Sequence, residues 1–354
     1  MLTVTFCLWT VTGKLIFMAT IREVADIAGV SVATVSRTLQ QPERVSPKTR
    51  ARVTNAIEQT GYKPNLMAVK FRSGKTHSLV VLVPTIANLF FARVINGMQE
   101  AAAERGYSLL LGNTQGNPDL EADYAKMVQT SQADGVIQLR AHNPFSVMQS
   151  SSGGLLPMVN ACEVIDSASF PTVTLDNHNA AKSMTEHLLE LGHTRIGLIK
   201  GPNSSPLTQE RLRGYQHALA NADIPFDESI LFDGDFTLRS GFDAARRMLE
   251  QPNRPTALFC ENDETAIGAM QALKQAGLKI PEDISVAGFD DIAFSGYADP
   301  PLTTIAQPAE EFGHTAVSLL VDVLNGKIKK APRVIMPHEL IVRNSTGPAP
   351  GTNA

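Results

Sequence analysis

Two patterns of hydrophobic positions divide the chain near residue 75. Before it, apolar residues recur every three or four positions, as in Ile21, Val24, Ala25 and Ala28. This spacing is typical of short amphipathic helices. After it, short apolar runs such as 78–84 (SLVVLVP) alternate with longer amphipathic stretches. Continuous apolar runs are typical of strands buried on both faces of a parallel sheet. The pattern therefore predicts a small helical unit followed by a large α/β region.

Caps and a glycine turn organise the small unit. Thr20 and Glu23 have the spacing of a capping box, so we expect a helix to begin there. Gly29 suits a left-handed helix exit, and Ser31 is a second N-cap that opens residues 32–39. A helix, a short turn containing glycine and a second helix form the helix-turn-helix arrangement.

The large region reads as alternating strands and helices. Predicted strands are 78–84, 107–112, 135–139, 196–200, 257–260 and 284–288, and predicted helices are 90–105, 119–133, 207–222, 237–250 and 263–276. This number of βα units exceeds one sheet, so we predict two doubly wound parallel-sheet subdomains. Ligands in such folds bind beyond the carboxyl ends of the strands. The space between the two sheets is therefore the expected ligand site.

Composition restricts the class of protein. With 354 residues, 43% of them apolar, and ordinary numbers of Gly and Pro, the chain is neither disordered nor collagen-like. Three cysteines, Cys7, Cys162 and Cys260, form neither a disulfide framework nor a C-x-x-C motif. The lack of a disulfide framework favours the reducing cytoplasm as the compartment of the protein. The formal net charge of −4 by itself argues against a nucleic-acid partner.

The distribution of charge reverses that last inference. Residues 18–75 hold ten Lys/Arg against four Asp/Glu, a net charge of +6. Lys14 adds one positive charge, so the rest of the chain carries −11. A small basic region joined to a large acidic one is typical of nucleic-acid binding. The alternative is a helical hairpin whose basic residues are merely a solvated face.

Helix-turn-helix geometry assigns roles to the second helix. Its N-terminal residues face base edges in the major groove. Val32 and Ala33 offer apolar contact to a thymine methyl group, and Arg37 matches the bidentate donor that guanine accepts. Hydroxyl side chains are candidates for phosphate contacts that fix register. The predicted DNA-binding residues of this unit are Thr20, Ser31, Val32, Ala33, Thr34, Ser36 and Arg37.

Residues 1–17 are apolar with one charge, and they are too short to span a bilayer. They also lack the features of a secretory signal. We interpret them as a disordered leader or a misassigned start, and expect no membrane association. No G-x-S-x-G, H-E-x-x-H, G-x-G-x-x-G or complete phosphate loop is present. We therefore expect no enzyme activity, no cofactor and no metal site.

The run 20–37, TIREVADIAGVSVATVSR, closely resembles the DNA-binding headpiece of LacI/GalR-type repressors. The likeness continues at 191–197, 210–215, 288–291 and 302–305. It implies a helix-turn-helix headpiece and a periplasmic-binding-protein-like core crossed three times by the chain. The implied divisions are a headpiece at 18–63, a hinge at 64–76, a core at 77–346 and a tail at 347–354, with an N-subdomain of about 77–175 and 306–334 and a C-subdomain of about 176–305 and 335–346.

The resemblance also implies a hinge helix that enters the minor groove from both subunits of a homodimer bound to double-stranded operator DNA. In this chain its residues would include Asn65, Ala68 and Phe71. An apolar wedge that unstacks a base step is a known minor-groove device. The family usually has Leu at the wedge position, where this sequence has Phe71.

Predicted strand ends carry the candidate effector residues. They are Phe90, Phe91, Phe236, Asn262, Asp263 and Asp290, together with Arg211 at the start of a helix. Aromatic rings with a carboxylate and an arginine suit a ligand that has a flat ring and hydroxyl groups. By the family resemblance, Arg211 and Asp290 would hydrogen-bond the effector, Phe236 would stack on it, and Phe90 and Phe91 would line the entrance. Core packing of the phenylalanines and a salt bridge between the charged pair are the alternatives.

Within the family, residues 234–237, 257–260 and 299–308 are most similar to the branch that responds to cytidine and to purines. Near 204–207 the chain lacks an arginine that purine-responsive members use. This favours a nucleoside effector over a purine base, with a sugar as the alternative. Two other functions remain to be distinguished: a periplasmic-type solute-binding protein and a regulator that needs no ligand.

Overall fold

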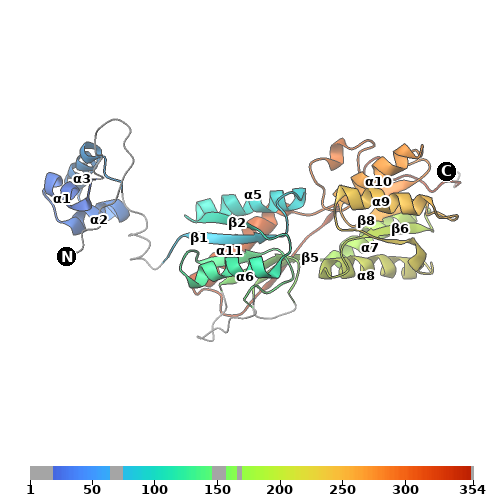
Figure 1. The fold of residues 1–354 in the computed structure, drawn as a ribbon, viewed down its shortest axis with the longest axis horizontal. Helices are drawn as coiled ribbons and strands as arrows, with labels where there is room; N and C mark the ends of the chain where they lie inside the picture. Colours follow the sequence, from blue (N-terminus) through green and yellow to red (C-terminus); the bar gives the residue numbers. More distant parts are fainter. Residues whose placement is uncertain (1–18, 64–74, 146–156, 166–169, 352–354) are drawn as a thin grey trace. The chain divides into compact units, whose positions relative to one another are not determined.

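The computed structural model describes residues 19–63, 75–145, 157–165 and 170–351 (Figure 1). The chain divides into two compact units, Met1–Gly74 and Lys75–Ala354. None of the helices in the described ranges combines the length and apolarity that crossing a bilayer requires. Nor do three His, Cys, Asp or Glu side chains converge as metal ligands in those ranges.

The first unit is a small helical bundle. Its helices are α1 (Ile21–Ala28), α2 (Val32–Gln40), the 3-10 turn η1 (Pro42–Arg44) and α3 (Pro47–Thr60). Their apolar faces meet in a core of Val24, Ala25, Ala28, Val35, Val53 and Ala56. Gly29 ends α1 with φ +59°, as the sequence predicts, because a residue without Cβ enters the left-handed region at low cost. The helix-turn-helix arrangement is confirmed, with η1 as an unpredicted addition.

The first lobe of the second unit contains a six-stranded parallel sheet in the order β11-β5-β4-β3-β1-β2. Its strands are β1 (Ser78–Val83), β2 (Ser108–Asn113), β3 (Gly135–Gln138), β4 (Met158–Cys162), β5 (Thr172–Leu175) and β11 (Arg333–Met336). Its helices are α5 (Leu89–Glu104), α6 (Pro118–Gln129) and α11 (Ala309–Leu324). Every residue of β1 is buried, which explains its uninterrupted apolar run.

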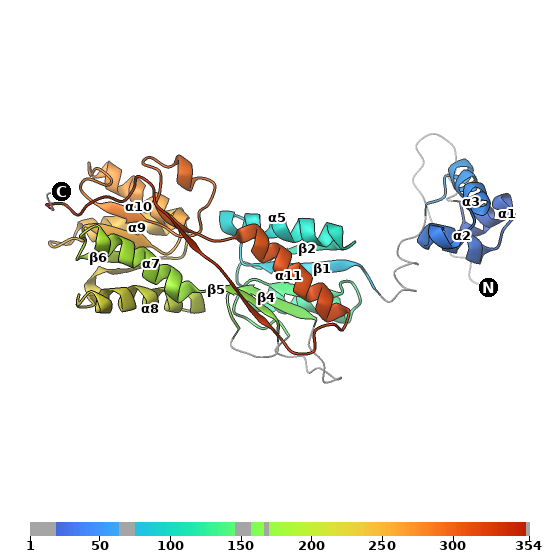
Figure 2. The ribbon, with the colours of Figure 1, turned by 180° about the vertical axis from the view of Figure 1, so that it is seen from behind.

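Alternation along β1 fills two separate cores. Leu79, Val81 and Val83 pack with α5 and α11 on one face of the sheet. Val80 and Leu82 pack with α6 on the other face. Successive side chains of a strand point to opposite faces, so one apolar run serves both layers. Figure 2 shows α5 and α11 lying side by side over the sheet.

The second lobe repeats this plan with a four-stranded parallel sheet in the order β7-β6-β8-β9. Its strands are β6 (Ile196–Lys200), β7 (Leu231–Asp233), β8 (Ala257–Cys260) and β9 (Ser285–Ala287). The helices α7 (Asn177–Glu190) and α8 (Pro206–Asn221) cover one face, and α9 (Leu238–Leu249) and α10 (Asp263–Gln275) cover the other (Figure 1). The short 3-10 turns η2 (Glu228–Ile230) and η3 (Ser295–Tyr297) lie in its connections. The predicted pair of doubly wound sheets is confirmed.

The chain passes between the lobes after β5, after β10 (Thr304–Ala306) and between β11 and β12 (Glu339–Ile341). Strands β10 and β12 form a two-stranded antiparallel sheet. The predicted subdomain boundary at 334/335 is wrong, because it falls inside β11, which pairs along its whole length with β5 in the first sheet. The sequence did not show this because β11 is a partly exposed edge strand without a continuous apolar run.

Candidate functional site

The start of α2 presents its side chains to solvent. Ser31 caps the helix by accepting a hydrogen bond from the backbone N–H of Thr34 at 3.2 Å, and the two hydroxyl groups lie 2.9 Å apart. Val32 is 38% exposed, and Ala33 and Arg37 are exposed as well. The Arg37 guanidinium has no hydrogen bond or ion pair to any described residue. This surface is therefore open to a partner.

Other predicted DNA-binding residues already have local hydrogen bonds. The Thr20 hydroxyl and the Glu23 carboxylate complete the capping box of α1. Ser36 is half-buried. Arg52, one of the ten cations of this unit, donates to the carbonyl of Gly29 at 3.1 Å and so acts as a C-cap of α1. The predicted hinge residues Asn65, Ala68 and Phe71 lie outside the described residues.

Arg211 is the centre of the polar cluster in the second unit. It lies on α8, is 4% exposed, and donates from Nε to Oδ1 of Asn177 at 2.9 Å. Its Nη1 donates to the carbonyl of Glu261, and its guanidinium lies 3.6 Å above the ring of Phe289. Burial lowers the pKa of Arg211, whereas nearby carboxylates, Asp290 first among them, raise it. Arginine stays protonated in proteins, so this is a buried cation.

Asp290 is the carboxyl that acts most strongly on the pKa of Arg211. It follows β9 with a φ of +111°, a region that non-glycine residues rarely adopt. Gln307 donates to its Oδ1 at 2.6 Å. Burial raises the pKa of Asp290 to about 8, although Arg211 opposes the shift. A carboxyl that holds a proton near neutral pH can donate as well as accept a hydrogen bond.

Asn262 and Asp263 are engaged in holding the fold. Asn262 caps α10 and donates to the carbonyl of Phe236 at 2.9 Å. The Asp263 carboxylate is fully buried and accepts from the Ile292 N–H and from two hydroxyl groups, those of Ser295 and Thr304. Burial raises its pKa to about 6. These hydrogen bonds connect α10 to Ile292, to η3 and to β10.

The three candidate phenylalanines lie in different surroundings. Phe236 is half-buried with φ +67°, and its ring occupies the space where a side chain at Gly201 would be, since a Cβ there would lie 1.9 Å from the ring. Phe91 is half-buried. Phe90 is 7% exposed and meets the ring of Phe312 edge-on at 6.2 Å in the core of the first lobe. Phe90 is thus a core residue here.

Sequence reasoning missed two acidic residues of this region. Glu163, just after β4, accepts from the Ala141 N–H at 2.8 Å and also from the Ser205 hydroxyl, so it joins the two lobes. Glu261, at the end of β8, is fully buried, and burial raises its pKa to about 7. Its Oε1 has no hydrogen-bond partner among the described residues. Their position in the sequence could have identified both acids, because each directly follows a buried strand.

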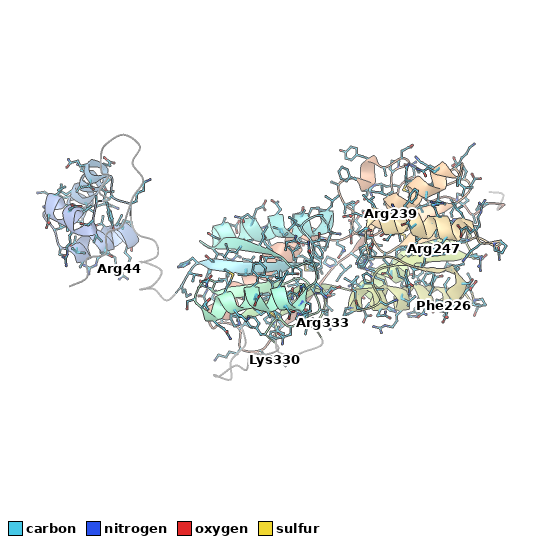
Figure 3. All side chains as sticks on the ribbon, in the orientation of Figure 1. Arg44, Phe226, Arg239, Arg247, Lys330 and Arg333 are labelled. Atoms are coloured by element: carbon cyan, nitrogen blue, oxygen red, sulfur yellow. The ribbon has the colours of Figure 1, made fainter. Side chains whose placement is uncertain are left out.

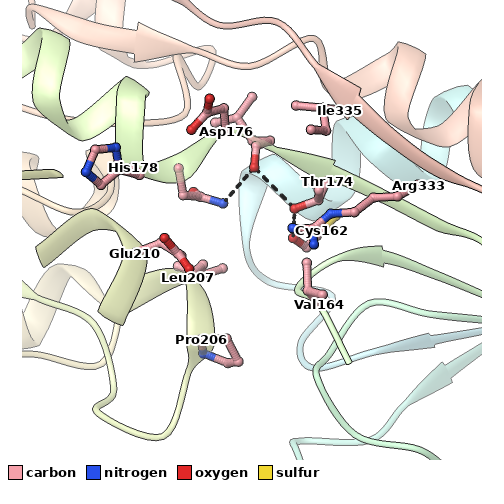
Figure 4. Close-up of a pocket in the computed structure, with 12 residues that line it drawn as sticks. Cys162, Val164, Thr174, Asp176, His178, Pro206, Leu207, Glu210, Arg333 and Ile335 are labelled. Carbon is pink, nitrogen blue, oxygen red and sulfur yellow. Dashed lines mark hydrogen bonds between the residues drawn. The ribbon is translucent and has the colours of Figure 1, made fainter. Parts of the chain in front are cut away.

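A cavity of about 490 Å³ opens between the lobes (Figure 4). It is lined by Cys162, Val164, Thr174, Leu175, Asp176, Asn177, His178, Pro206, Leu207, Glu210, Arg333 and Ile335. These residues come from the ends of β4 and β5, from β11 and from the first turns of α7 and α8. None of the seven predicted effector residues lines it, but Asn177 both lines it and accepts from Arg211. The cavity therefore adjoins the buried cluster.

Two family models match the chain. Residues 20–65 match the model of bacterial regulatory proteins of the lacI family, and residues 185–346 match a periplasmic binding protein-like domain. The Escherichia coli K12 HTH-type transcriptional repressor CytR is 40% identical over 332 residues, covering 94% of this chain and 97% of that protein. The repressor PurR of Aliivibrio salmonicida is 34% identical over 329 residues, covering 93% and 99%.

Solved structures show the same architecture. The lac repressor dimer bound to operator and the anti-inducer ONPF matches with a TM-score of 0.83 and 29% identity. The match covers 94% of this chain and all of that chain. A helix-turn-helix unit joined to a two-lobed α/β core is thus common to the chain and to this repressor. The headpiece match over residues 20–65 argues against a periplasmic solute-binding protein.

Proposed function

The chain belongs to the LacI family and is an effector-controlled DNA-binding repressor rather than an enzyme, and we propose that its effector is a nucleoside held beside Arg211 and Asp290. The observation that carries the proposal is the burial of both side chains, with the Arg211 guanidinium 3.6 Å above the ring of Phe289. Ligand sites in such folds are mostly apolar with a few well-placed polar groups. The pair supplies those polar groups.

The two sides of a nucleoside match different groups here. Ribose hydroxyls donate and accept, so they suit the Arg211 guanidinium and the Asp290 carboxyl, whose pKa burial raises to about 8 so that it holds a proton near neutral pH. The base is flat, and the half-buried ring of Phe236 offers a stacking surface. The Oε1 of Glu261, which has no partner among the described residues, is a further acceptor on a residue whose carbonyl Arg211 contacts. A cavity of about 490 Å³ lies within the usual range of ligand pockets, roughly 300–1,000 Å³.

Ligand stabilisation tests this proposal directly. A ligand that binds only the folded chain raises stability by about 2.7 kcal/mol at one hundred times its Kd. We expect thermal unfolding of the full chain to shift upward with cytidine, uridine or adenosine, and to shift less with ribose or free cytosine. Titration calorimetry on Asp290→Asn then checks the site, since loss of the carboxyl should weaken the same nucleoside. Stabilisation by none of these compounds contradicts the proposal.

A sugar effector is the second candidate. Arg211, Asp290 and Asn177 form a hydrogen-bonding set that would also suit the hydroxyls of a hexose. The half-buried ring of Phe236 would then pack on the apolar face of the sugar instead of a base. Hexoses and disaccharides therefore belong in the same thermal panel. A shift with a sugar and none with a nucleoside selects this alternative.

For the operator, we infer that the exposed start of α2 reads base edges. Val32 and Ala33 suit a thymine methyl group, and Arg37 suits the acceptor edge of guanine. The hydroxyls of Thr34 and Ser36 suit phosphates. Thr20 and Ser31 act chiefly by capping, which orients α1 and α2. The proposed hinge contacts of Asn65, Ala68 and Phe71 remain to be tested by substitution and duplex binding.

One headpiece covers one half-site, so we infer a homodimer. Exposed apolar side chains support this, notably Leu110 and Leu111 on the edge strand β2 and Phe294 and Tyr297 around η3. Apolar side chains gathered on a surface mark association sites. Light scattering on Leu111→Glu and Tyr297→Glu variants should show a shift from dimer to monomer. An unchanged mass for both contradicts this choice of surface.

Coupling between effector and operator would run through the contacts that join the lobes. Glu163 accepts from Ser205, the Leu89 N–H donates to Glu264 at 3.2 Å, and Arg93 donates to the carbonyl of Asp291 at 3.0 Å. An effector shifts operator affinity only by its differential affinity for two arrangements of the lobes. Comparing effector affinity with and without bound duplex measures that difference.

A further inference from the structure

A group of lysines interrupts the acidic surface of the second unit. Between Asp322 and Glu339 the sequence contains Lys327, Lys329, Lys330 and Arg333 and no acidic residue. The second unit as a whole is acidic, with 31 of the 35 Asp and Glu residues after position 75. Charges of one sign gathered on a surface of the opposite sign create a local field that acts on a charged partner.

These lysines are available for such a partner. Lys327, Lys329 and Lys330 are exposed on the segment 325–332, which joins α11 to β11. Lys327 is paired with Asp322 at 2.9 Å, and Lys329 and Lys330 have no partner among the described residues. Figure 3 shows Lys330 at the margin of the first lobe. Arg333 lines the cavity and is left out of the group.

The segment lies where the chain enters the core from the DNA-binding unit. The Lys75 ammonium, at the first residue of the second unit, donates to Oδ1 of Asn325 at 3.0 Å. The next two residues are fixed by Asp134, which accepts from the N–H groups of Thr76 and His77. In Figures 1 and 2 the end of α11 and the start of β1 lie at the same end of the first lobe.

The topology accounts for this placement. β1 and β11 are strands of one parallel sheet, so both strands begin at the same end of that sheet. The second unit begins at Lys75 and its first strand is β1, and the segment 325–332 that carries the lysines is followed by β11. Lys329 is four residues from Asn325, which limits the separation of their backbones to roughly 14 Å. Residues 64–74 connect this end of the sheet to the DNA-binding unit.

We propose that Lys327, Lys329 and Lys330 contact phosphates of the duplex that the DNA-binding unit holds. The inference rests on the DNA-binding function of the chain. An acidic core close to a polyanion raises the free energy of the complex by repulsion. Three lysines at the tethered end of the first lobe reduce that repulsion and release counterions, independently of base sequence.

The test compares two triple variants of the full chain. Lys327, Lys329 and Lys330 are changed to Gln in one, and Arg246, Arg254 and Lys279 in the other. The second set is also exposed, has no side-chain partner among the described residues, and lies in the second lobe. Both variants lose three positive charges. The probes are a duplex selected by the wild-type chain from a random-sequence pool and a scrambled duplex of equal length.

The measurement is the slope of log affinity against log salt concentration. Each phosphate contact contributes about 0.9 to this slope, so loss of three contacts should reduce it by roughly 2.7. From about 50 mM to about 200 mM salt, wild-type affinity should then fall roughly 40-fold further than that of the lysine variant. The loss should be equal on both duplexes, because phosphates carry no sequence information. The control variant should keep nearly the wild-type slope.

The outcomes separate the proposal from the function on which it rests. Equal slopes for the two variants overturn the proposed phosphate contacts. A wild-type chain that selects no duplex and binds selected and scrambled DNA alike contradicts the operator-binding function itself. Thermal unfolding of both variants at the wild-type temperature establishes that the folded state is unchanged, as expected for exposed side chains.

Discussion

The two proposed binding regions of this repressor differ in how exposed their side chains are and in how many hydrogen bonds they already make. At the start of α2, Val32 and Arg37 are exposed, and the Arg37 guanidinium has no hydrogen bond or ion pair to a described residue. In the core, Arg211 and Asp290 are buried and already hydrogen-bonded. The operator is large and charged, so its reader can stay hydrated until it docks. A small effector offers little area, so its site must be desolvated and organised beforehand.

The difference has a consequence for substitutions. An exposed reading residue contributes to binding and hardly to folding, because surface changes usually alter stability by no more than about 0.5 kcal/mol. A buried charged residue contributes to both, because its removal leaves a partner unpaired in a medium of low polarity. Substitutions of each kind of residue should therefore separate binding from folding.

Arg211→Ala is expected to have the largest effect. Arg211 is a buried cation hydrogen-bonded to Asn177 and to the Glu261 carbonyl, and removing a buried, hydrogen-bonded charge costs about 2–5 kcal/mol in binding. Effector affinity, measured by calorimetry, should fall correspondingly, and the thermal stability of the core should fall as well. Arg213→Ala is the matched control, since Arg213 is an exposed residue of the same helix with an ion pair to Glu210. If both variants bind effector equally, Arg211 is not in the site.

Asp263→Asn should affect folding without a direct effect on the ligand. Its carboxylate holds the Ile292 N–H and the hydroxyls of Ser295 and Thr304. Hydrogen bonds to a charged group contribute about 1.5–3 kcal/mol each, and an amide retains part of that. We expect denaturant unfolding to show a loss of roughly 2 kcal/mol. Asp243→Asn should lose far less, because Asp243 is half-buried and its partner Arg239 is an exposed side chain. A stable Asp263 variant with weakened effector binding would reassign Asp263 to the site.

Arg37→Ala should weaken operator binding by roughly 1–3 kcal/mol, the usual contribution of a bidentate base contact. Thermal stability should stay at the wild-type value, because the side chain is exposed and without a partner among the described residues. Gel-shift titration against selected and scrambled duplexes measures the effect. Arg50→Ala, exposed on α3, should weaken both duplexes alike. If Arg37→Ala weakens binding to the two duplexes equally, Arg37 does not contact base edges.

Stability should also depend on pH through the core alone, and this is the smallest expected effect. Burial raises the pKa of Asp290 to about 8 and that of Glu261 to about 7, above their unfolded values. The folded chain therefore binds more protons than the unfolded chain in this range, and stability falls as pH rises to about 8. Measurement from about pH 7 to about 8.5 avoids the histidines whose pKa burial lowers, which are then neutral in both states.

We expect the unfolding temperature of the core to drop by several degrees across that window, since 1 kcal/mol corresponds to about 2–4 °C in a domain of this size. Asp290→Asn should make the dependence shallower. A stability that rises with pH over the same window contradicts the raised pKa values.

Sequence reasoning located much of the candidate site but not its organisation. Asp290 was found because it follows a strand, where α/β proteins bind ligands, and Arg211 because it was expected at a helix start, although it lies in the second turn of α8. Glu163 was missed because nothing near it in sequence shows that Ser205 of the other lobe lies beside it. Phe90 and Phe91 are adjacent and looked alike, yet the helix turns one into the core and leaves the other half-buried.

The sequence by itself determined the helix-turn-helix unit, the presence of two parallel sheets and the separation of a basic headpiece from an acidic core. These depend on local interactions: caps, glycine exits, the period of apolar residues and the sum of charges. Tertiary structure alone decided that β11 belongs to the first sheet and that the Lys327–Lys330 segment lies beside the chain entry. It also decided which carboxyls lose water and hold protons. Those properties arise between residues far apart in the chain, whose distances no local pattern encodes.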